Sequence, residues 1–340
     1  MTRQLLTLLL LLPFSLFYAQ DKVNLLIEEG IKLHDEGNYK EAIECYKQAL
    51  KLDAQNPTLN YEIAYSYDAL GDFKKSIEYA KKAITYGQNQ LPLSYVALGN
   101  AYDHDNKPEK AIKTYRKGLS YFPDNQLLHY NIACTFFNQK DYHEAFNHAE
   151  QSLLAKPSHF NSHVIINNLM MLSVTTEASL FPKYFMMLFN QNTAMQKLIH
   201  GELIEIMNQS IDRKDPDNIN IYLSPDENNM KDFRHHLKTI IALFAAPLKD
   251  GLPENFKKYT DFNTLIFDEL VRWYESEDRI KDQSLIYEEI YYPYFVNLHK
   301  AGHTEAFTFF ILDRSDVPGL KEWKEKNDQK LINYMDWSNQ

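Results

Sequence analysis

The sequence predicts an all-α fold whose first half consists of stacked helical hairpins. A pattern recurs between residues 23 and 157 with steps of 34, 35 and 34 residues, marked by small residues at Gly30, Ala64, Gly99 and Ala133. One helical hairpin per repeat is typical of this period, because a single hairpin cannot bury its own apolar face. The chain has only 10 glycines and 13 prolines, and 44% of its residues are hydrophobic. Few stretches alternate apolar and polar residues, which also favours helix over sheet.

Each repeat contains the signals of two helices separated by a turn. A second set of small residues stands twelve positions after the first, at Ala42, Ser76, Ala111 and Ala145. Small residues at these positions let the two helices of a hairpin approach closely. Turn-forming residues lie between the two sets, at Gly37-Asn38, Gly71-Asp72, Asn106-Lys107-Pro108 and Lys140-Asp141. They predict where the first helix ends and the second begins.

With this spacing, the pattern resembles the tetratricopeptide repeat. The resemblance covers residues 20–157, with Pro123 and Pro157 closing the last two repeats and Ala49 to Asp53 ending the first. Repeat two departs from the family at Ser76 and Ala80. The resemblance implies four repeats arranged as a helical solenoid.

Residues 158–194 are predicted to form a degenerate fifth hairpin. Asn167 occupies the usual small position, and Leu180 stands where Ala is expected. Such departures are typical of the end of a repeat stack.

Residues 195–340 are predicted to form an irregular α-helical domain. The 34-residue phase is lost there, and the segment resembles no enzyme family. A loop is expected from Asp212 to Asn229, where Asp215-Pro216-Asp217 is a turn former. Helical periodicity persists in Lys197–Met207, Asp232–Leu248, Phe262–Ser276, Ile280–Lys300 and Leu320–Trp337.

The first 19 residues have the layout of a secretory signal peptide. Arg3 precedes a mostly apolar stretch from Leu5 to Tyr18, and Ala19 provides a small residue at the cut. The stretch is shorter than the roughly 20 residues of a bilayer span. We therefore expect export. Together with the repeats, this signal resembles cell-envelope repeat proteins of Gram-negative bacteria, which favours the periplasm. Secretion, or an uncleaved anchor because Phe17 is large, stays open.

The charge argues against nucleic acid as a partner. The chain has 36 Lys and Arg against 46 Asp and Glu, a formal net charge of -10. This acidity repels phosphate backbones and anionic lipid surfaces. The two cysteines, Cys45 and Cys134, lie three hairpins apart, so no internal disulfide is expected and both are predicted to be small buried residues.

The resemblance implies that the inner face of the first helices lines a concave groove for a peptide or another protein's helix. Family members that grip a C-terminal carboxylate use Lys, Arg and Asn on this face. The corresponding positions here carry no Lys or Arg, which disfavours a carboxylate clamp. Aromatic, amide and acidic side chains instead suit an uncharged or basic segment. The predicted groove residues are Tyr61, Tyr65, Asp68, Asn100, Asp103, Tyr130, Asn131, Phe137 and Asn138, flanked by Asn24, Ile27, Ile31, His34, Val96, His104 and Cys134.

For each tyrosine in this set, an alternative is simple packing between neighbouring first helices.

Other candidate sites carry weaker signals. His159 and His163 have the i, i+4 spacing of metal ligands, but zinc needs three or four ligands and no supporting residue follows. Acidic runs such as Glu275 to Asp278 resemble a solvated helix face more than an acid and base pair. The aromatic run from Tyr287 to Phe295 is predicted to be a core helix kinked at Pro293.

Function is therefore predicted to be non-enzymatic binding of a protein or peptide in the cell envelope, without cofactor or metal. One alternative attaches the repeats to a hydrolytic or carbohydrate-binding C-terminal domain, with carboxylates converging in a pocket walled by Tyr287 to Tyr294. A second alternative is a structural subunit of an envelope assembly, recognised by a large exposed apolar area away from the groove.

Overall fold

A computed structural model gives the structure of residues 20–88, 91–172, 176–190, 192–209, 211–215, 218–221, 233, 237, 239–241, 255–277, 279 and 284–339. The signal segment predicted at residues 1–19 lies outside these ranges, as does most of the helix predicted at Asp232–Leu248. The chain divides into two compact units, the first ending at His148 and the second beginning at Ala149. The domain limits expected from the sequence remain predictions.

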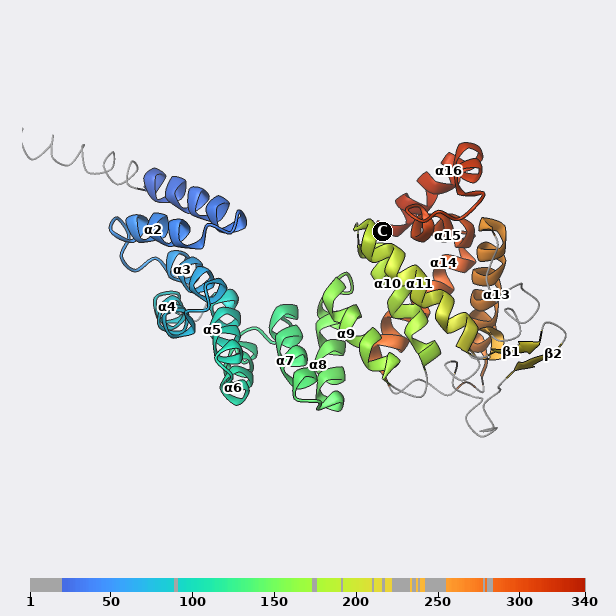
Figure 1. Cartoon of the computed structure of the whole chain (residues 1–340), viewed down its shortest axis with the longest axis horizontal. Helices are drawn as coiled ribbons and strands as arrows, with labels where there is room; N and C mark the ends of the chain where they lie inside the picture. The colour runs from blue at the N-terminus through green and yellow to red at the C-terminus, as the bar shows by residue number, and fades with distance from the viewer. Residues whose placement is uncertain are drawn as a thin grey trace, which may run out of the picture. The chain divides into compact units, whose positions relative to one another are not determined.

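The first unit is a series of helix pairs that follow one another in chain order (Figure 1). From α2 to α7 each helix contacts the next, and the first helices of successive pairs also contact one another, as in α3 with α5 and α5 with α7. The predicted all-α repeat architecture is confirmed. Its helices are one over residues 20–35, then α2 (Tyr39–Leu50), α3 (Pro57–Ala69), α4 (Phe73–Tyr86), α5 (Pro92–His104), α6 (Pro108–Leu119), α7 (Gln126–Asn138) and α8 (Tyr142–Ala155), which contains the boundary between the units.

The turn within each repeat has the same backbone geometry four times. One residue per turn adopts the left-handed conformation, with φ of 82° at Gly37, 75° at Gly71, 56° at Asn106 and 62° at Lys140. The next backbone N–H then bonds the carbonyl five residues earlier, as from Asp72 to Tyr67 at 2.9 Å. This bond satisfies a carbonyl at the helix end. Gly fits the turn without strain, whereas Lys140 adopts it against its own preference.

Two glycines let an aromatic ring pass between the helices of a repeat. A Cβ built on Gly30 would lie 2.3 Å from Tyr46 Cε1, and one on Gly99 would lie 2.0 Å from Tyr115 Cε1. Both tyrosines come from the second helix of the repeat and are almost completely buried. The corresponding pairs in repeats two and four are Ala64 with Ala80 and Ala133 with Ala149, all buried. The repeats therefore use either a Gly and Tyr pair or an Ala and Ala pair at this position.

The second unit is an irregular helical assembly, as predicted. Helices α9 and α10 pack against each other in the predicted fifth hairpin, and α13 contacts both α14 and α15. Its elements are α9 (Phe160–Met171), the short η1 (Thr176–Ser179), α10 (Leu180–Phe189), α11 (Thr193–Gln209), β1 (Ile211–Asp215), β2 (Asn218–Ile221), α13 (Phe256–Glu275), η4 (Tyr287–Tyr291), α14 (Tyr292–Lys300), α15 (Thr304–Leu312) and α16 (Leu320–Ser338).

Part of the predicted loop Asp212–Asn229 is an antiparallel strand pair, which corrects the prediction. Strands β1 and β2 lie side by side (Figure 1). Ile211 pairs with Ile221 and Asp212 with Asn220. The pairing follows from the alternation of Asn and Ile over residues 218–221, the period of a strand. In the sequence, the turn formers on both sides outweigh this four-residue alternation and favour a loop.

The aromatic run from Tyr287 belongs to the core, as predicted. Tyr287, Tyr291, Tyr292 and Phe295 are completely buried. A π-helical segment over Tyr287–Tyr291 precedes Pro293, with the Tyr292 N–H bonding the Tyr287 carbonyl. Proline cannot donate the next helical hydrogen bond, so the helix widens just before it.

A buried amine joins three helices of the second unit. The Lys183 side chain on α10 is completely buried, and its Nζ donates to Asn167 Oδ1 on α9 and to Ser179 Oγ. Glu202 on α11 supplies the opposite charge at 3.1 Å. An unpaired buried ammonium would be strongly unfavourable, so these contacts fix α9, α10 and α11 together.

Replacing Gly99 with Ala is expected to lower the free energy of unfolding by about 1–3 kcal/mol, because the new methyl group overlaps the Tyr115 ring. Urea denaturation measures the change. Gly201→Ala in α11 is the control, since a Cβ there meets nothing within 4 Å and should stabilise the helix by roughly 0.5–1 kcal/mol. Equal effects from the two substitutions would contradict the packing described here.

Candidate functional site

Four aromatic rings form a continuous row on the surface of repeats one and two. His34 stacks on Tyr65 with 4.5 Å between ring centroids, and Tyr65 stacks on Tyr61 at 6.1 Å. Tyr39 meets the other side of His34 edge-on. Tyr65 remains 46% exposed although two rings flank it, so one face of the row is open to a ligand. Among the predicted groove residues, Tyr65 is therefore the best placed to contact a partner.

Polar side chains near the C-terminal end of each first helix connect it to the next first helix. His34 Nδ1 lies 2.9 Å from Ser66 Oγ, and Thr135 Oγ1 donates to Asp103 Oδ2 at 3.2 Å. Asp68 and His104 form an ion pair at 2.9 Å, and this hydrogen bond raises the pKa of His104. Asp68 and Asp103 were predicted as ligand contacts. The structure uses both of them to link successive repeats.

Asn100 supports the core. Its Oδ1 accepts a hydrogen bond from the buried Tyr115 hydroxyl at 2.7 Å. We call the face of the first helices that carries the predicted groove residues the first-helix surface. The Tyr115 ring passes Gly99, so its buried hydroxyl lies at the base of this surface, next to Asn100. Removing the amide would leave a buried donor unsatisfied, which costs about 1–3 kcal/mol. Loss of binding in an Asn100 variant would therefore not distinguish contact with a partner from loss of folding.

The predicted residues of repeat four lie along α7. Asn131 donates to the Leu127 carbonyl of its own helix at 2.7 Å, and Tyr130 is hydrogen bonded to the Cys134 thiol. Phe137 is half-buried against Tyr142, whereas Asn138 is exposed. Both cysteines are free, as predicted, but they are only partly buried. As ligand contacts, these residues remain predictions.

Glu62 is a residue of this surface that the sequence reasoning missed. It follows Tyr61 directly on α3 and is half-buried. Burial, and secondly the negative charge of Asp35, raise the pKa of its carboxyl to about 7. No described residue offsets this with a hydrogen bond or ion pair. The corresponding position of repeat four is Asn131, which was predicted, and this register relation was the signal available.

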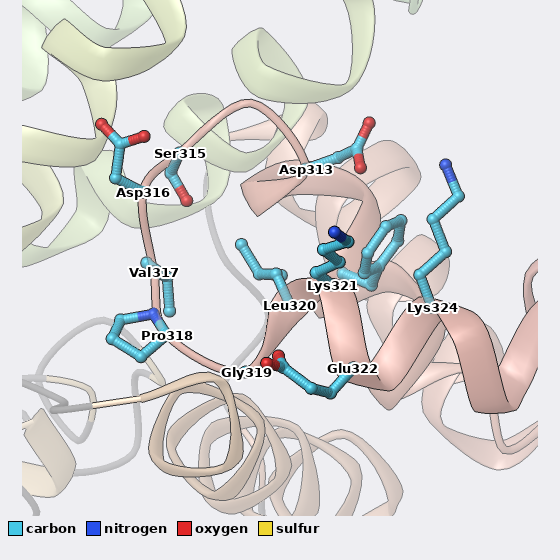
Figure 2. Close-up of a pocket in the computed structure, with 11 residues that line it drawn as sticks. Asp313, Ser315, Asp316, Val317, Pro318, Gly319, Leu320, Lys321, Glu322 and Lys324 are labelled. Atoms are coloured by element: carbon cyan, nitrogen blue, oxygen red, sulfur yellow. The ribbon is translucent and has the colours of Figure 1, made fainter.

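The second unit has an open hollow of about 480 Å³ at the start of α16. Its wall includes Asp313, Asp316 and Glu322, which Figure 2 shows on different sides of the hollow. Asp316 pairs with Lys197 at 2.9 Å. The Tyr287 to Tyr294 run does not line it, and the carboxylates do not converge. The features required by the hydrolytic or carbohydrate-binding alternative are thus not combined here.

The histidines considered as metal ligands have other partners. The buried His163 ring contacts the Tyr291 hydroxyl at 2.9 Å and the Pro157 carbonyl at 2.7 Å, and burial lowers its pKa to about 3. His159 bonds Ser162, and His299 bridges Asp268 and Thr304. Within the described ranges, no group of three or more His, Cys, Asp or Glu is placed to hold a metal ion.

Acidic runs in the second unit are largely paired with basic residues. Glu275 bonds Lys300, Glu269 bonds Arg272, and Glu288 bonds Arg279 at 2.9 Å. None of the helices in the described part of the chain combines the length and apolar character needed to cross a membrane.

Family models match the helix pairs of the first unit. Residues 30–71 match a model described as TPR repeat, and residues 57–87, 93–125 and 128–159 match one described as tetratricopeptide repeat. These segments are tetratricopeptide repeats. The first-helix surface described above therefore belongs to the first helices of these repeats.

Curated relatives match from 31% to 39% of this chain in the three examples that follow. BBSome complex member BBS4 of Bos taurus is 25% identical over 134 residues, which are 39% of this chain and 25% of that protein. Hsp70-Hsp90 organising protein of Plasmodium falciparum is 29% identical over 32% of this chain and 43% of its own length. RNA polymerase II-associated protein 3 of Mus musculus is 35% identical over 31% and 16% respectively. The chain thus matches less than half the length of each.

The chain is also similar to solved structures of tetratricopeptide-repeat proteins. The first tetratricopeptide domain of Spaghetti (RPAP3), bound to an HSP90 peptide, is 27% identical with a TM-score of 0.33, covering 35% of this chain and 97% of that chain. A tetratricopeptide protein of Thermus thermophilus is 17% identical with a TM-score of 0.46, covering 53% of this chain and 98% of that chain.

Glu62→Gln is expected to stabilise the fold in a pH-dependent way. Between the ordinary value of 4.5 and about 7, the folded chain binds a proton that the unfolded chain releases, so the contribution of Glu62 to stability falls as pH rises. At about pH 8 the variant should gain roughly 1–2 kcal/mol, less than the full pKa shift implies because the carboxyl keeps some contact with water. Near pH 4 the gain should vanish. Urea denaturation at both pH values measures it, and a pH-independent effect would contradict the raised pKa.

Proposed function

We propose that the protein is a non-enzymatic scaffold whose tetratricopeptide repeats bind a peptide or protein segment along the first-helix surface. The observation that carries the proposal is the open row of stacked rings ending at Tyr65 and Tyr61. Stacked aromatic side chains supply contact area at low entropic cost, and such residues dominate peptide interfaces. The exposed amide of Asn138 lies further along the same set of helices and offers a hydrogen bond to a partner backbone.

The preferred segment is uncharged or basic. Asp35, Glu62, Asp68 and Asp103 place carboxylates on or beside this surface, and the predicted groove positions carry no Lys or Arg. Burial raises the pKa of Asp103 as well as that of Glu62, although Asp103 accepts a hydrogen bond from Thr135. An acidic segment would add further negative charge to this surface, whereas a basic one would relieve it.

The relatives support binding of other proteins. By their names, one organises Hsp70 and Hsp90 and another is a member of the BBSome complex. The role of the second unit, including any activity of its own, is a separate matter.

The proposal includes export to the cell envelope, with the periplasm as the favoured location. It rests on the basic start, the apolar stretch from Leu5 to Tyr18 and the small Ala19. The acidic net charge of -10 is consistent with a partner other than nucleic acid or an anionic membrane surface.

Synthetic peptides test the binding proposal. Three peptides of about 12 residues, roughly 40 Å when extended, share one Tyr, Ser and Asn background and carry Lys, Gln or Glu at the variable positions. In fluorescence anisotropy, the basic peptide should bind more tightly than the neutral one, and the acidic one most weakly. Tyr65→Ala should weaken binding about tenfold or more, because it removes the exposed ring. Tyr86→Ala, an exposed tyrosine of α4, is the matched control. Equal binding of acidic and basic peptides would contradict the proposed preference.

Expression in a Gram-negative host tests export. The protein should be recovered in the periplasmic fraction with a mass corresponding to cleavage after Ala19, since the segment up to there has the signal layout. The substitution Leu9→Arg places a charge in the apolar stretch, and the full-length chain of this variant should stay in the cytoplasm. Cytoplasmic retention of the unaltered chain would contradict the proposal.

A further inference from the structure

A buried hydroxyl without a partner lies beneath the acidic part of the first-helix surface. Tyr46 is completely buried, and its hydroxyl has no hydrogen-bond partner among the described residues. Its counterpart in repeat three, Tyr115, donates to Asn100. The residue of repeat one in the Asn100 position is Ile31, which accepts no hydrogen bond. The unsatisfied hydroxyl is therefore a specific feature of repeat one.

The direction of this hydroxyl follows from the packing. The Tyr46 ring passes Gly30 as the Tyr115 ring passes Gly99, so both hydroxyls reach the base of the first-helix surface. After burial itself, the titratable groups that raise the pKa of Tyr46 most are Glu62 and Asp35, followed by Cys45 and Tyr61. Within the described residues, a hydroxyl without an acceptor and two carboxylates without an ion-pair partner thus influence one another electrostatically.

We propose that Glu62, Asp35 and the Tyr46 hydroxyl form a subsite for the ammonium or guanidinium group of a lysine or arginine side chain. This inference rests on the proposed binding function and names the side chain that the surface reads. The cation pairs with Glu62 and Asp35, the apolar part of the side chain lies along the Tyr61 ring, and the Tyr46 hydroxyl donates to the Glu62 carboxylate. Each unsatisfied group then gains a partner.

The surrounding titratable groups are consistent with a cationic ligand. His34 stacks beside Tyr65, and burial lowers its pKa, so it is neutral near pH 7 and does not repel a cation. Tyr61 and Tyr46 stay protonated, because burial raises both of their pKa values. His104 is engaged with Asp68 between repeats two and three. A destabilising carboxyl such as Glu62 is typical of a binding site, where function and stability conflict.

Discrimination between the basic and neutral peptides tests the subsite. The unaltered protein should prefer the basic peptide about tenfold or more, with Lys and Arg versions both effective. Glu62→Gln should reduce this ratio to roughly one. Tyr46→Phe keeps the ring packing and should reduce the ratio partway. Glu78→Gln, an exposed carboxylate on α4 with the same change in charge, is the control and should leave the ratio intact.

A second variant adds a hydrogen-bond acceptor for the Tyr46 hydroxyl. Ile31→Asn should supply the Tyr46 hydroxyl with an acceptor, as Asn100 does for Tyr115, and so reduce the preference for the basic peptide without unfolding the protein. Equal ratios in the Glu62→Gln and Glu78→Gln variants would overturn the subsite, because only long-range charge would then be at work.

A small probe separates failure of the subsite from failure of the proposed function. If no peptide binds, n-butylammonium is titrated against the unaltered protein while NMR follows the Glu62 carboxyl carbon. Lowering of the Glu62 pKa by the probe, absent with the neutral analogue n-butanol, would support the subsite even if peptide binding fails. No change in that pKa would overturn it. Peptides that bind equally well with and without Lys would leave the proposed scaffold function standing and reject this inference alone.

Discussion

The close passage of a tyrosine ring over a glycine backbone is the contact on which the first-helix surface depends. At Gly30 and Gly99 the absence of a side chain lets Tyr46 and Tyr115 cross from the second helix toward the first. The ring fills the space between the helices, and its hydroxyl lies at the base of the first-helix surface. Packing and polar chemistry are therefore set by the same residue pair, because the close approach that closes the core also delivers a hydroxyl to the surface.

The polar side chains of this surface divide into two groups. Asp68, Asp103 and Asn100 are committed to other parts of the array, two of them across neighbouring first helices and one to a buried tyrosine. Tyr65 and Glu62 have no such commitment and keep unused capacity, one as an exposed ring and the other as an uncompensated carboxyl. Recognition in the proposed scaffold is thus concentrated in repeats one and two, whereas later repeats contribute mainly to holding the array together.

Much of the first unit could be predicted from the sequence, because its signals repeat in phase. The 34-residue steps fix both helices of each hairpin, and the turn residues lie where Gly37, Gly71, Asn106 and Lys140 adopt the left-handed conformation. The family resemblance also located the first-helix surface. Sequence position alone does not show what a side chain already contacts, so Asn100 was expected to meet a ligand although it holds Tyr115. Glu62 was missed because its importance comes from burial beside Asp35. In the second unit no period exists, and the four-residue alternation of β2 was too short to outweigh the turn formers around it.

The space between the two helices of a repeat is filled in two ways, which alternate along the array. Gly with Tyr occurs in repeats one and three, and Ala with Ala in repeats two and four, so each solution returns after 69 residues, from Gly30 to Gly99 and from Ala64 to Ala133. Neither solution converts to the other by one substitution, since a methyl group at the glycine collides with the ring and a ring at the alanine collides with the methyl group. The internal packing of the array therefore recurs once every two hairpins, with a hydroxyl-bearing ring in alternate repeats only.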